Sequence, residues 1–235
     1  MDVRTALKRL PVLQALPAID REAFVSVGAV VELGPDEMIW ERGEAATNFT
    51  FLIDGNVRLV VRAPVHGRGE RECLIALVEA PGSLLCGAAV CGFSSYCCDS
   101  ICTQRTSVLS LPREALAPRQ DSSSAFLLNQ VAARGMTLCR RVREVGGTRV
   151  EERVAAVLLR LADERGVQTD KGVKLPSIIS RRDLAGLSGC ATETLIRLLA
   201  RFEERGGVVR SRRGLFVVPE VLVAIVGGAD ESGPT

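Results

Sequence analysis

Hydrophobic positions divide the chain into three stretches with different periods. Residues 3–27 show helical spacing, with a leucine at every third position of one run, although two prolines break the pattern into short pieces. From Val30 to about Leu111, short apolar runs alternate with turn residues, which is typical of strands. From about Ser122 the helical period returns.

The middle stretch predicts an antiparallel barrel or roll. Its strand-like runs are Met38–Trp40, Phe49–Ile53, Val57–Val61, Leu74–Val78 and Val108–Leu111. Asp54–Gly55 joins two of these runs and is a strong hairpin signal, because two-residue turns need residues that tolerate positive φ. No long helical segment separates the runs, which favours antiparallel pairing.

A narrow apolar stripe follows the strands. Its members recur at alternating spacings of three and four residues: Leu128, Val131, Gly135, Leu138, Val142 and Val145. Such a heptad stripe on a lone helix usually packs against a second copy of itself. We therefore predict a dimerisation helix over residues 122–147, ending at Gly146–Gly147. The alternative is a helix that lies on its own β domain.

Residues 180–218 predict a winged helix-turn-helix. Ser180 and Asp183 can form a capping box for a first short helix, and Gly189 supplies the turn. Thr192 can cap a second helix, and the following "VVRSRRGLFVV" predicts a hairpin wing. The apolar face predicted for the second helix contains Leu195, Ile196, Leu198, Leu199 and Phe202.

The polar side of this segment suits double-stranded DNA. Arginine can pair with guanine and glutamate with cytosine, while hydroxyl groups reach phosphates. Between Ser180 and Gly214 there are eight arginines and four acidic residues, an excess that favours counterion release from DNA. The predicted DNA-binding residues are Ser180, Arg181, Thr192, Glu193, Thr194, Arg197 and Arg201. The alternative is a module used only for protein contacts.

Composition adds a cluster of cysteines to this picture. Five of the eight cysteines fall within residues 84–102: Cys86, Cys91, Cys97, Cys98 and Cys102. Neither a targeting segment nor a membrane span is evident, so we expect a cytoplasmic protein without membrane contact. Thiols stay reduced in the cytoplasm, where clustered cysteines indicate metal binding or redox chemistry rather than structural disulfides.

The chain resembles the family of the cyclic-AMP receptor protein and the fumarate–nitrate reduction regulator (Crp–Fnr). The resemblance spans about residues 7–226. Its N-terminal half rests on "LPVLQALP", "ELGPDEMIWERGEAATNFTFLIDGNVRLVV" and "LSLPREAL", and its C-terminal half on "SRRDLAGLSGCATETLIRLLARFEERGGV". Both halves occur in family order around the heptad helix.

This resemblance implies an α+β fold in three parts. An antiparallel, jelly-roll-like β-roll that senses an effector occupies residues 1–121, the dimerisation helix residues 122–147, and the winged helix-turn-helix residues 148–235. It also implies a homodimer that binds a palindromic operator and contacts RNA polymerase. Glu193 and Arg197 fall at the family's base-contacting positions and Thr192 at a neighbouring contact, while Ile196 replaces a serine of fumarate–nitrate-type regulators.

The chain departs from the family at the ligand pocket. Members that bind cyclic nucleotides carry Gly-Glu after the Pro-Gly turn and Arg-Ser about ten residues later. Here Cys86–Gly87 takes the first place, and Tyr96–Cys97 or Cys97–Cys98 the second. Without the arginine a buried phosphate has no cationic partner, so we expect no cyclic nucleotide. The N-terminal cluster-binding cysteines of the fumarate–nitrate regulator are missing as well.

Four uses of the clustered thiols remain open. Cys86 and Cys91 are predicted on a short helix, Cys98 and Cys102 on one face of a strand, and Cys97 on the opposite face. An iron–sulfur cluster of the 4Fe–4S type that senses oxygen, redox state or nitric oxide is the first interpretation. The alternatives are a thiol–disulfide switch, a soft-metal site, and cysteines that simply fill a collapsed pocket. The working ligand set is Cys86, Cys91, Cys97 and Cys102, with Cys98 as a substitute for Cys97.

An enzyme is not expected. The chain has one histidine, His66, in a polar turn, so a catalytic cysteine has no evident base. No phosphate-binding loop, GxSxG or HExxH motif occurs.

Overall fold

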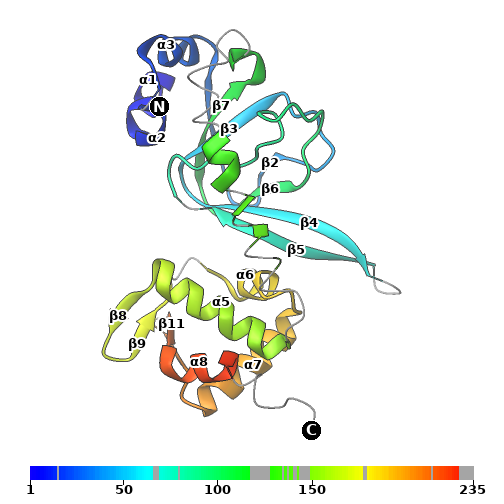
Figure 1. The fold of residues 1–235 in the computed structure, drawn as a ribbon, viewed down its shortest axis with the longest axis vertical. Coiled ribbons are helices and arrows are strands. Elements are labelled where there is room, and N and C mark those ends of the chain that lie inside the picture. The colour runs from blue at the N-terminus through cyan, green and yellow to red at the C-terminus, as the bar shows by residue number, and fades with distance from the viewer. Residues whose placement is uncertain are drawn as a thin grey trace. The chain divides into compact units, whose positions relative to one another are not determined.

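The structure is a computed structural model, which describes residues 1–14, 16–65, 69–78, 80–116, 128–133, 135–136, 138–139, 142, 149–176, 179–212 and 214–227. The chain divides into two compact units, residues 1–138 and 139–235, which Figure 1 shows as a ribbon. The two predicted domain boundaries, after residue 121 and after residue 147, lie outside the described residues.

Three short helices begin the first unit. They are α1 (Val3–Arg9), α2 (Pro11–Gln14) and α3 (Ala18–Val27). The helical pieces predicted from the leucine spacing are confirmed, and the four leucines of that run are buried: Leu7, Leu10, Leu13 and Leu16.

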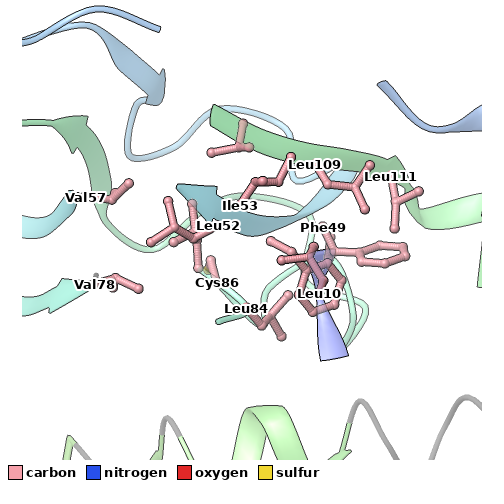
Figure 2. Packing of buried hydrophobic residues seen from close by; sticks show 14 of the residues in the cluster. Leu10, Phe49, Leu52, Ile53, Val57, Val78, Leu84, Cys86, Leu109 and Leu111 are labelled. Atoms are coloured by element: carbon pink, nitrogen blue, oxygen red, sulfur yellow. The ribbon is translucent and has the colours of Figure 1, made fainter. Parts of the chain in front are cut away.

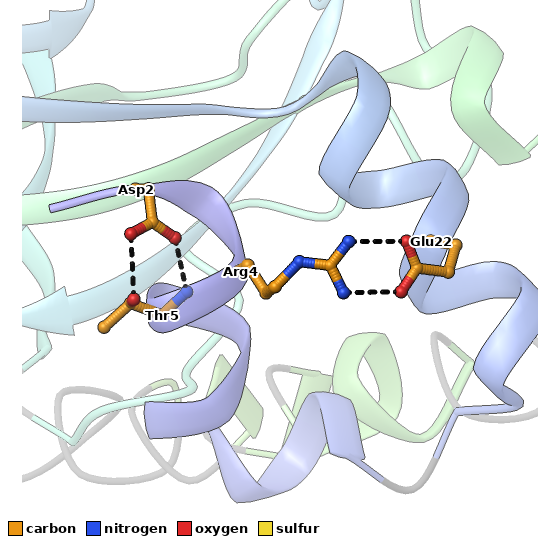
Figure 3. A network of polar contacts seen from close by, with 4 residues as sticks. All are labelled: Asp2, Arg4, Thr5 and Glu22. Carbon is orange, nitrogen blue, oxygen red and sulfur yellow. Dashed lines mark hydrogen bonds and ion pairs between the residues drawn. The ribbon is translucent and has the colours of Figure 1, made fainter.

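Polar contacts at the surface fix the start of α1 and join it to α3 (Figure 3). The carboxylate of Asp2 accepts hydrogen bonds from the Thr5 amide at 2.8 Å and from its hydroxyl at 2.9 Å, which caps the helix. The Arg4 guanidinium donates to both carboxylate oxygens of Glu22, at 2.7 and 2.8 Å. Both partners are largely exposed, so this pair orients the helices more than it stabilises them.

Two antiparallel sheets form the β-roll of the first unit (Figure 1). One sheet has the strand order β1-β7-β3 and the other β2-β6-β4-β5. The strands are β1 (Ala29–Leu33), β2 (Met38–Trp40), β3 (Asn48–Asp54), β4 (Val57–Val65), β5 (Gly69–Val78), β6 (Asp99–Cys102) and β7 (Thr106–Pro112), followed by the 3-10 helix η1 (Arg113–Leu116). The predicted antiparallel roll is confirmed.

The core of this unit is aliphatic with a small aromatic centre. Phe49 makes edge-to-face contacts with Phe24 of α3 and with Phe51 of β3, each at a centroid distance of 6.0 Å. Figure 2 shows Cys86 in the same cluster of buried side chains as Leu52 and other aliphatic residues. The cysteine segment is therefore part of the core of the β-roll.

β1 was not predicted, and β6 was predicted only through the strand parity of its cysteines. β1 is an edge strand whose side chains are half-buried or exposed, so its apolar alternation is weak. β6 begins with two polar residues that are nevertheless buried, Asp99 and Ser100. The Asp99 carboxylate accepts a hydrogen bond from the Arg42 amide at 2.8 Å and pairs with Arg62 at 3.5 Å, which compensates its burial.

The second unit combines helices with a four-stranded sheet of order β10-β11-β9-β8. Its elements are α5 (Val150–Arg165), β8 (Val167–Thr169), β9 (Gly172–Lys174), α6 (Arg181–Leu187), α7 (Thr192–Glu204), β10 (Val208–Ser211), β11 (Gly214–Val217) and α8 (Pro219–Gly227). The helix-turn-helix and its hairpin wing are confirmed. The β8–β9 hairpin was missed because strands of three residues carry too little pattern. None of the described helices is both long enough and apolar enough to cross a membrane.

We expect the aromatic contacts of Phe24 to stabilise the packing of the N-terminal helices more than the ion pair between Arg4 and Glu22 does. Phe24 is 2% exposed, so Phe24→Ala should lower the free energy of unfolding by about 3–5 kcal/mol, measured by denaturant titration. Glu22→Gln, the matched control on the same helix, should change the unfolding midpoint very little. Equal losses for both variants would contradict this assignment.

Candidate functional site

The cysteine segment enters the core beside β3 and leaves it as β6. The Leu85 amide donates to the carbonyl of Thr50 at 2.9 Å, which ties the segment to β3. Residues 87–92 then form a series of turns instead of the short helix predicted for Cys86–Cys91. Glycines at both ends account for the difference, since they weaken a helix and Gly92 has a φ of +80°.

Three of the five clustered thiols come together at the start of β6. Cys86 and Cys98 are buried, whereas Cys97 is exposed. The sulfur of Cys86 accepts a hydrogen bond from the Ala88 amide at 3.4 Å and interacts with the thiols of Cys98 and Cys97. Residues 86, 97 and 98, called here the thiol triplet, are thus a single interacting group.

The triplet distributes its protons unequally. A hydrogen bond from the Cys98 thiol, helped by the Ala88 amide and Cys97, lowers the pKa of Cys86 to about 6, although burial opposes the change. The same bond raises the pKa of Cys98 well above its usual range, and burial adds to this effect. Burial and the charge on Cys86 also raise the pKa of Cys97. At neutral pH the negative charge therefore resides on Cys86.

An aromatic stack fixes the backbone that carries two of these thiols. Trp40 and Tyr96 are stacked at a centroid distance of 4.4 Å and an interplanar angle of 16°. The Trp40 indole donates to the Cys98 carbonyl at 2.9 Å, and the Tyr96 hydroxyl donates to the Asn48 carbonyl at 2.7 Å. Strand β2 and the start of β3 therefore hold residues 96–98 in place.

The two remaining cysteines of the segment lie apart from the triplet. Cys91 is exposed in the turn region, and Cys102 is fully buried at the end of β6, where its carbonyl accepts from the Asp36 amide at 2.8 Å. Burial raises the pKa of Cys102, which keeps its thiol protonated at neutral pH. As the strand parity predicted, Cys98 and Cys102 are both buried while Cys97 is not.

This arrangement does not fit the predicted four-cysteine metal site. Among the described residues, no group of three or more histidine, cysteine or acidic side chains is arranged to hold a metal ion. An iron–sulfur cluster takes four cysteine ligands, and the working set Cys86, Cys91, Cys97 and Cys102 is not gathered at one point. The iron–sulfur cluster stays a prediction.

The thiol triplet adjoins the helix that carries the heptad stripe. A methyl group added at Gly87 would lie 3.0 Å from Cγ2 of Val131, so these residues are in close contact. Val131 is half-buried against the core of the β-roll. The stripe residues Leu128, Leu138 and Val142 are exposed instead, and a methyl group added at Gly135 would meet no described atom within 4 Å. Val145 lies outside the described residues.

The first helix of the helix-turn-helix is capped as predicted. The Ser180 hydroxyl accepts from the Asp183 amide at 3.1 Å, and the Asp183 carboxylate accepts from the Ser180 amide at 3.1 Å. Gly189 takes a φ of +60° in the turn. The predicted cap at Thr192 is wrong, because Ala191 occupies the cap position and Thr192 is the first residue of α7. Ser180 and Arg181 are both exposed at the start of α6.

Helix α7 separates a buried face from a polar face. Its buried side chains are Leu195, Leu198, Leu199 and Phe202. The predicted DNA-binding residues of this helix are exposed or half-exposed: Thr192, Glu193, Thr194, Arg197 and Arg201. The Arg197 guanidinium donates to the Thr194 hydroxyl at 3.4 Å, so these two side chains are neighbours on the polar face.

Ile196 does not lie on the apolar face predicted for the second helix. It is 40% exposed, because the buried positions follow spacings of three and four that skip residue 196. An apolar group among polar readers can contact a thymine methyl in the major groove. The helical period of the buried positions predicts that residue 196 is exposed.

An ion pair attaches the wing to the end of α7. Glu203 accepts from the Arg210 amide at 3.1 Å and from its Nε at 2.7 Å, and a second guanidinium nitrogen contacts the same carboxylate. Arg212, two residues further along the wing, is exposed. This contact fixes where the wing lies relative to the reading helix.

Comparisons with known proteins agree with both halves of this description. Residues 152–221 match the model of the Crp-like helix-turn-helix domain. The chain is 23% identical over 230 residues to the nitrogen fixation regulation protein FixK of Bradyrhizobium diazoefficiens, covering 95% of this chain and 92% of the relative.

Solved structures show the same fold. The c-di-GMP responsive global regulator CLP of Xanthomonas campestris matches with a TM-score of 0.72 at 16% identity, covering 86% of this chain and 99% of that chain. FixK2 of Bradyrhizobium japonicum matches with a TM-score of 0.67 at 22% identity, covering 84% of this chain and 96% of that chain. The α+β architecture of the prediction is therefore confirmed, and the matched proteins are regulators rather than enzymes.

We expect Arg197 to read a base. Duplexes selected from a random-sequence pool should define a preferred site, and Arg197→Ala should cost about 1–3 kcal/mol there and relax preference at one base pair. Arg205→Ala is the matched control, since Arg205 ends the same helix and pairs with Glu151 at 2.9 Å. Unchanged base preference in the Arg197 variant, measured by fluorescence anisotropy, would contradict the assignment.

We also expect Cys86 to react as a thiolate at neutral pH. With a pKa of about 6, Cys86 carries about thirtyfold more thiolate at pH 7 than an ordinary thiol. Its rate of alkylation by iodoacetamide, followed by mass spectrometry, should rise with pH through about 6 and then level off. The exposed Cys91 provides the comparison within the same segment. A Cys86 rate that still climbs steeply between pH 7 and 9 would exclude the thiolate.

Proposed function

We propose that the chain is a DNA-binding transcription regulator of the Crp–Fnr family, that the thiol triplet is its sensor and that its signal is oxidation. Regulators of this family bind DNA and act as dimers. The observation that carries the proposal is the grouping of the three thiols, in which the buried Cys86 sulfur accepts hydrogen bonds from Cys98 and Ala88 inside the β-roll. A palindromic operator and contact with RNA polymerase are parts of the same proposal.

Cys86 is the thiol that reacts with the oxidant. Thiolates, not thiols, are the nucleophiles, and a hydroperoxide is an oxidant of suitable class. The Cys86 sulfur attacks the terminal oxygen, the O–O bond breaks, and the leaving oxygen takes a proton to become water or an alcohol. The sulfur becomes a sulfenic acid, two electrons more oxidised than the thiolate.

Cys98 is the thiol that completes the reaction. Its pKa is raised mainly by its hydrogen bond to the Cys86 thiolate, and this effect ends when Cys86 loses its negative charge. Cys98 can then lose its proton and attack the Cys86 sulfur as a thiolate. The S–S bond forms and hydroxide leaves. The hydroxide takes up the proton that Cys98 lost and becomes water. Overall, two thiols and one hydroperoxide give one disulfide, one water and one water or alcohol.

The contact between Gly87 and Val131 supports a route from this reaction to the helix. Gly87 directly follows Cys86, and an added methyl there would lie 3.0 Å from Val131. Forming a disulfide at Cys86 moves the adjacent backbone, and close-packed groups transmit such shifts. Val131 belongs to the stripe predicted to pair the two subunits, so oxidation would bias the arrangement of the dimer that fits DNA.

We expect one equivalent of hydrogen peroxide to remove two thiols from the reduced protein and to join the peptides that contain Cys86 and Cys98. Trp40 is the only tryptophan and donates to the Cys98 carbonyl, so its fluorescence should follow the reaction. DNA affinity, measured by anisotropy before and after oxidation, should change and return on reduction.

Three variants separate the roles of the cysteines. Cys86→Ser should not respond to peroxide, and Cys98→Ser should stop at a sulfenic acid that dimedone traps. Cys91→Ser, a change at the exposed thiol of the same segment, should behave as the unsubstituted protein. Stoichiometric iron and sulfide in anaerobically purified protein would instead favour the cluster, and peroxide-insensitive DNA binding in protein that forms the disulfide would overturn the switch.

A further inference from the structure

The DNA-binding unit contains a cavity that the proposed sensor does not use. It has a volume of about 340 Å³ and lies between the start of α6, the buried side of α7 and the β10–β11 wing. This volume is at the lower end of the range of small-molecule sites, roughly 300–1,000 Å³. The cavity is therefore large enough for a small organic ligand.

Apolar side chains form part of the lining of this cavity. The lining leucines come from α6, α7, β11 and the segment after β9: Leu184, Leu199, Leu215 and Leu175. Leu184 and Leu199 are buried in the protein, while Ile179 and Leu215 at the sides are half-buried. An aliphatic or aromatic group that enters the cavity would cover these side chains and gain from the burial of apolar surface.

The rim of the cavity is cationic. Arg181 from the start of α6 and Arg212 from the wing both border it and are exposed. Within the described residues, no acidic side chain pairs with either of them. The third arginine on the rim, Arg210, is already held by Glu203. Two guanidinium groups at the mouth of an apolar cavity suit a single carboxylate.

We propose that this cavity binds a small amphiphilic carboxylate, such as a medium-chain fatty acid. The carboxylate pairs with Arg181 and Arg212, and the hydrocarbon chain lies on Leu184, Leu199 and Leu215. Apolar walls with few convergent polar groups are the usual composition of such sites.

Binding of this ligand opposes binding of DNA. Arg181 is a predicted DNA contact, and Arg212 is an exposed cation of the wing that flanks the reading helix. A carboxylate that pairs with both arginines lowers the local net charge by one and occupies two guanidinium groups otherwise available to phosphates, which lowers DNA affinity. The ligand thus acts on the second unit directly, independently of the thiol triplet.

Sodium octanoate is the probe, added to the full-length, reduced protein with methyl-labelled leucine. Saturable NMR shifts are expected for Leu184, Leu199 and Leu215, and not for core leucines of the first unit such as Leu109. Octan-1-ol tests the need for charge and butyrate the need for chain length, so both should bind more weakly. Octanoate should also weaken binding of a duplex DNA when acetate at equal ionic strength does not.

Variants of the rim locate the carboxylate. Arg181→Ala and Arg212→Ala should each raise the octanoate dissociation constant about fivefold, the upper range for an exposed ion pair. Arg182→Ala is the matched control, because Arg182 neighbours Arg181 on α6 without lining the cavity and should change it less than about twofold. No saturable shift at the named leucines, or equal binding of octanol and octanoate, would overturn the proposal.

Discussion

The stack of Trp40 on Tyr96 is the constraint on which the proposed sensor depends. These are the only tryptophan and the only tyrosine of the chain, and both also donate hydrogen bonds to backbone carbonyls. One of those carbonyls belongs to Cys98, so the stack fixes the residue whose thiol donates to Cys86. A lowered thiol pKa requires donors held at hydrogen-bond distance inside the protein, and a mobile loop would not provide them.

The same segment contains both a reactive thiol and a contact with the helix that carries the heptad stripe. Cys86 and Gly87 are adjacent, one in the thiol triplet and the other against Val131. By the family resemblance, thiols stand where a cyclic-nucleotide pocket would have its carboxylate and arginine, next to the contact between Gly87 and Val131. In the proposed mechanism, a change of one covalent bond at Cys86 acts on this contact with the helix.

How much was predictable differed between the two units. The winged helix-turn-helix follows from local signals, since the capping box at Ser180 and the turn at Gly189 are formed by neighbours in the sequence. The thiol triplet joins Cys86 to residues eleven and twelve positions later through a path of turns, which periodicity does not describe. The density of cysteines in this segment predicted one metal site with four cysteine ligands. The burial of the polar start of β6 was not predictable for a related reason, because Asp99 depends on the distant Arg42 and Arg62.

The DNA-binding unit has two features that the helix-turn-helix motif does not predict: the exposed Ile196 and the cavity with arginines on its rim. Exposure of an isoleucine among polar readers adds an apolar contact to the reading face, and two arginines on the rim of an apolar cavity serve either phosphate or carboxylate. Oxidation in the first unit would alter how two subunits present their helices, whereas a carboxylate in the second would alter the charge that each subunit offers. The first mechanism needs the dimer and the second does not, so the two inputs can be combined without sharing a site.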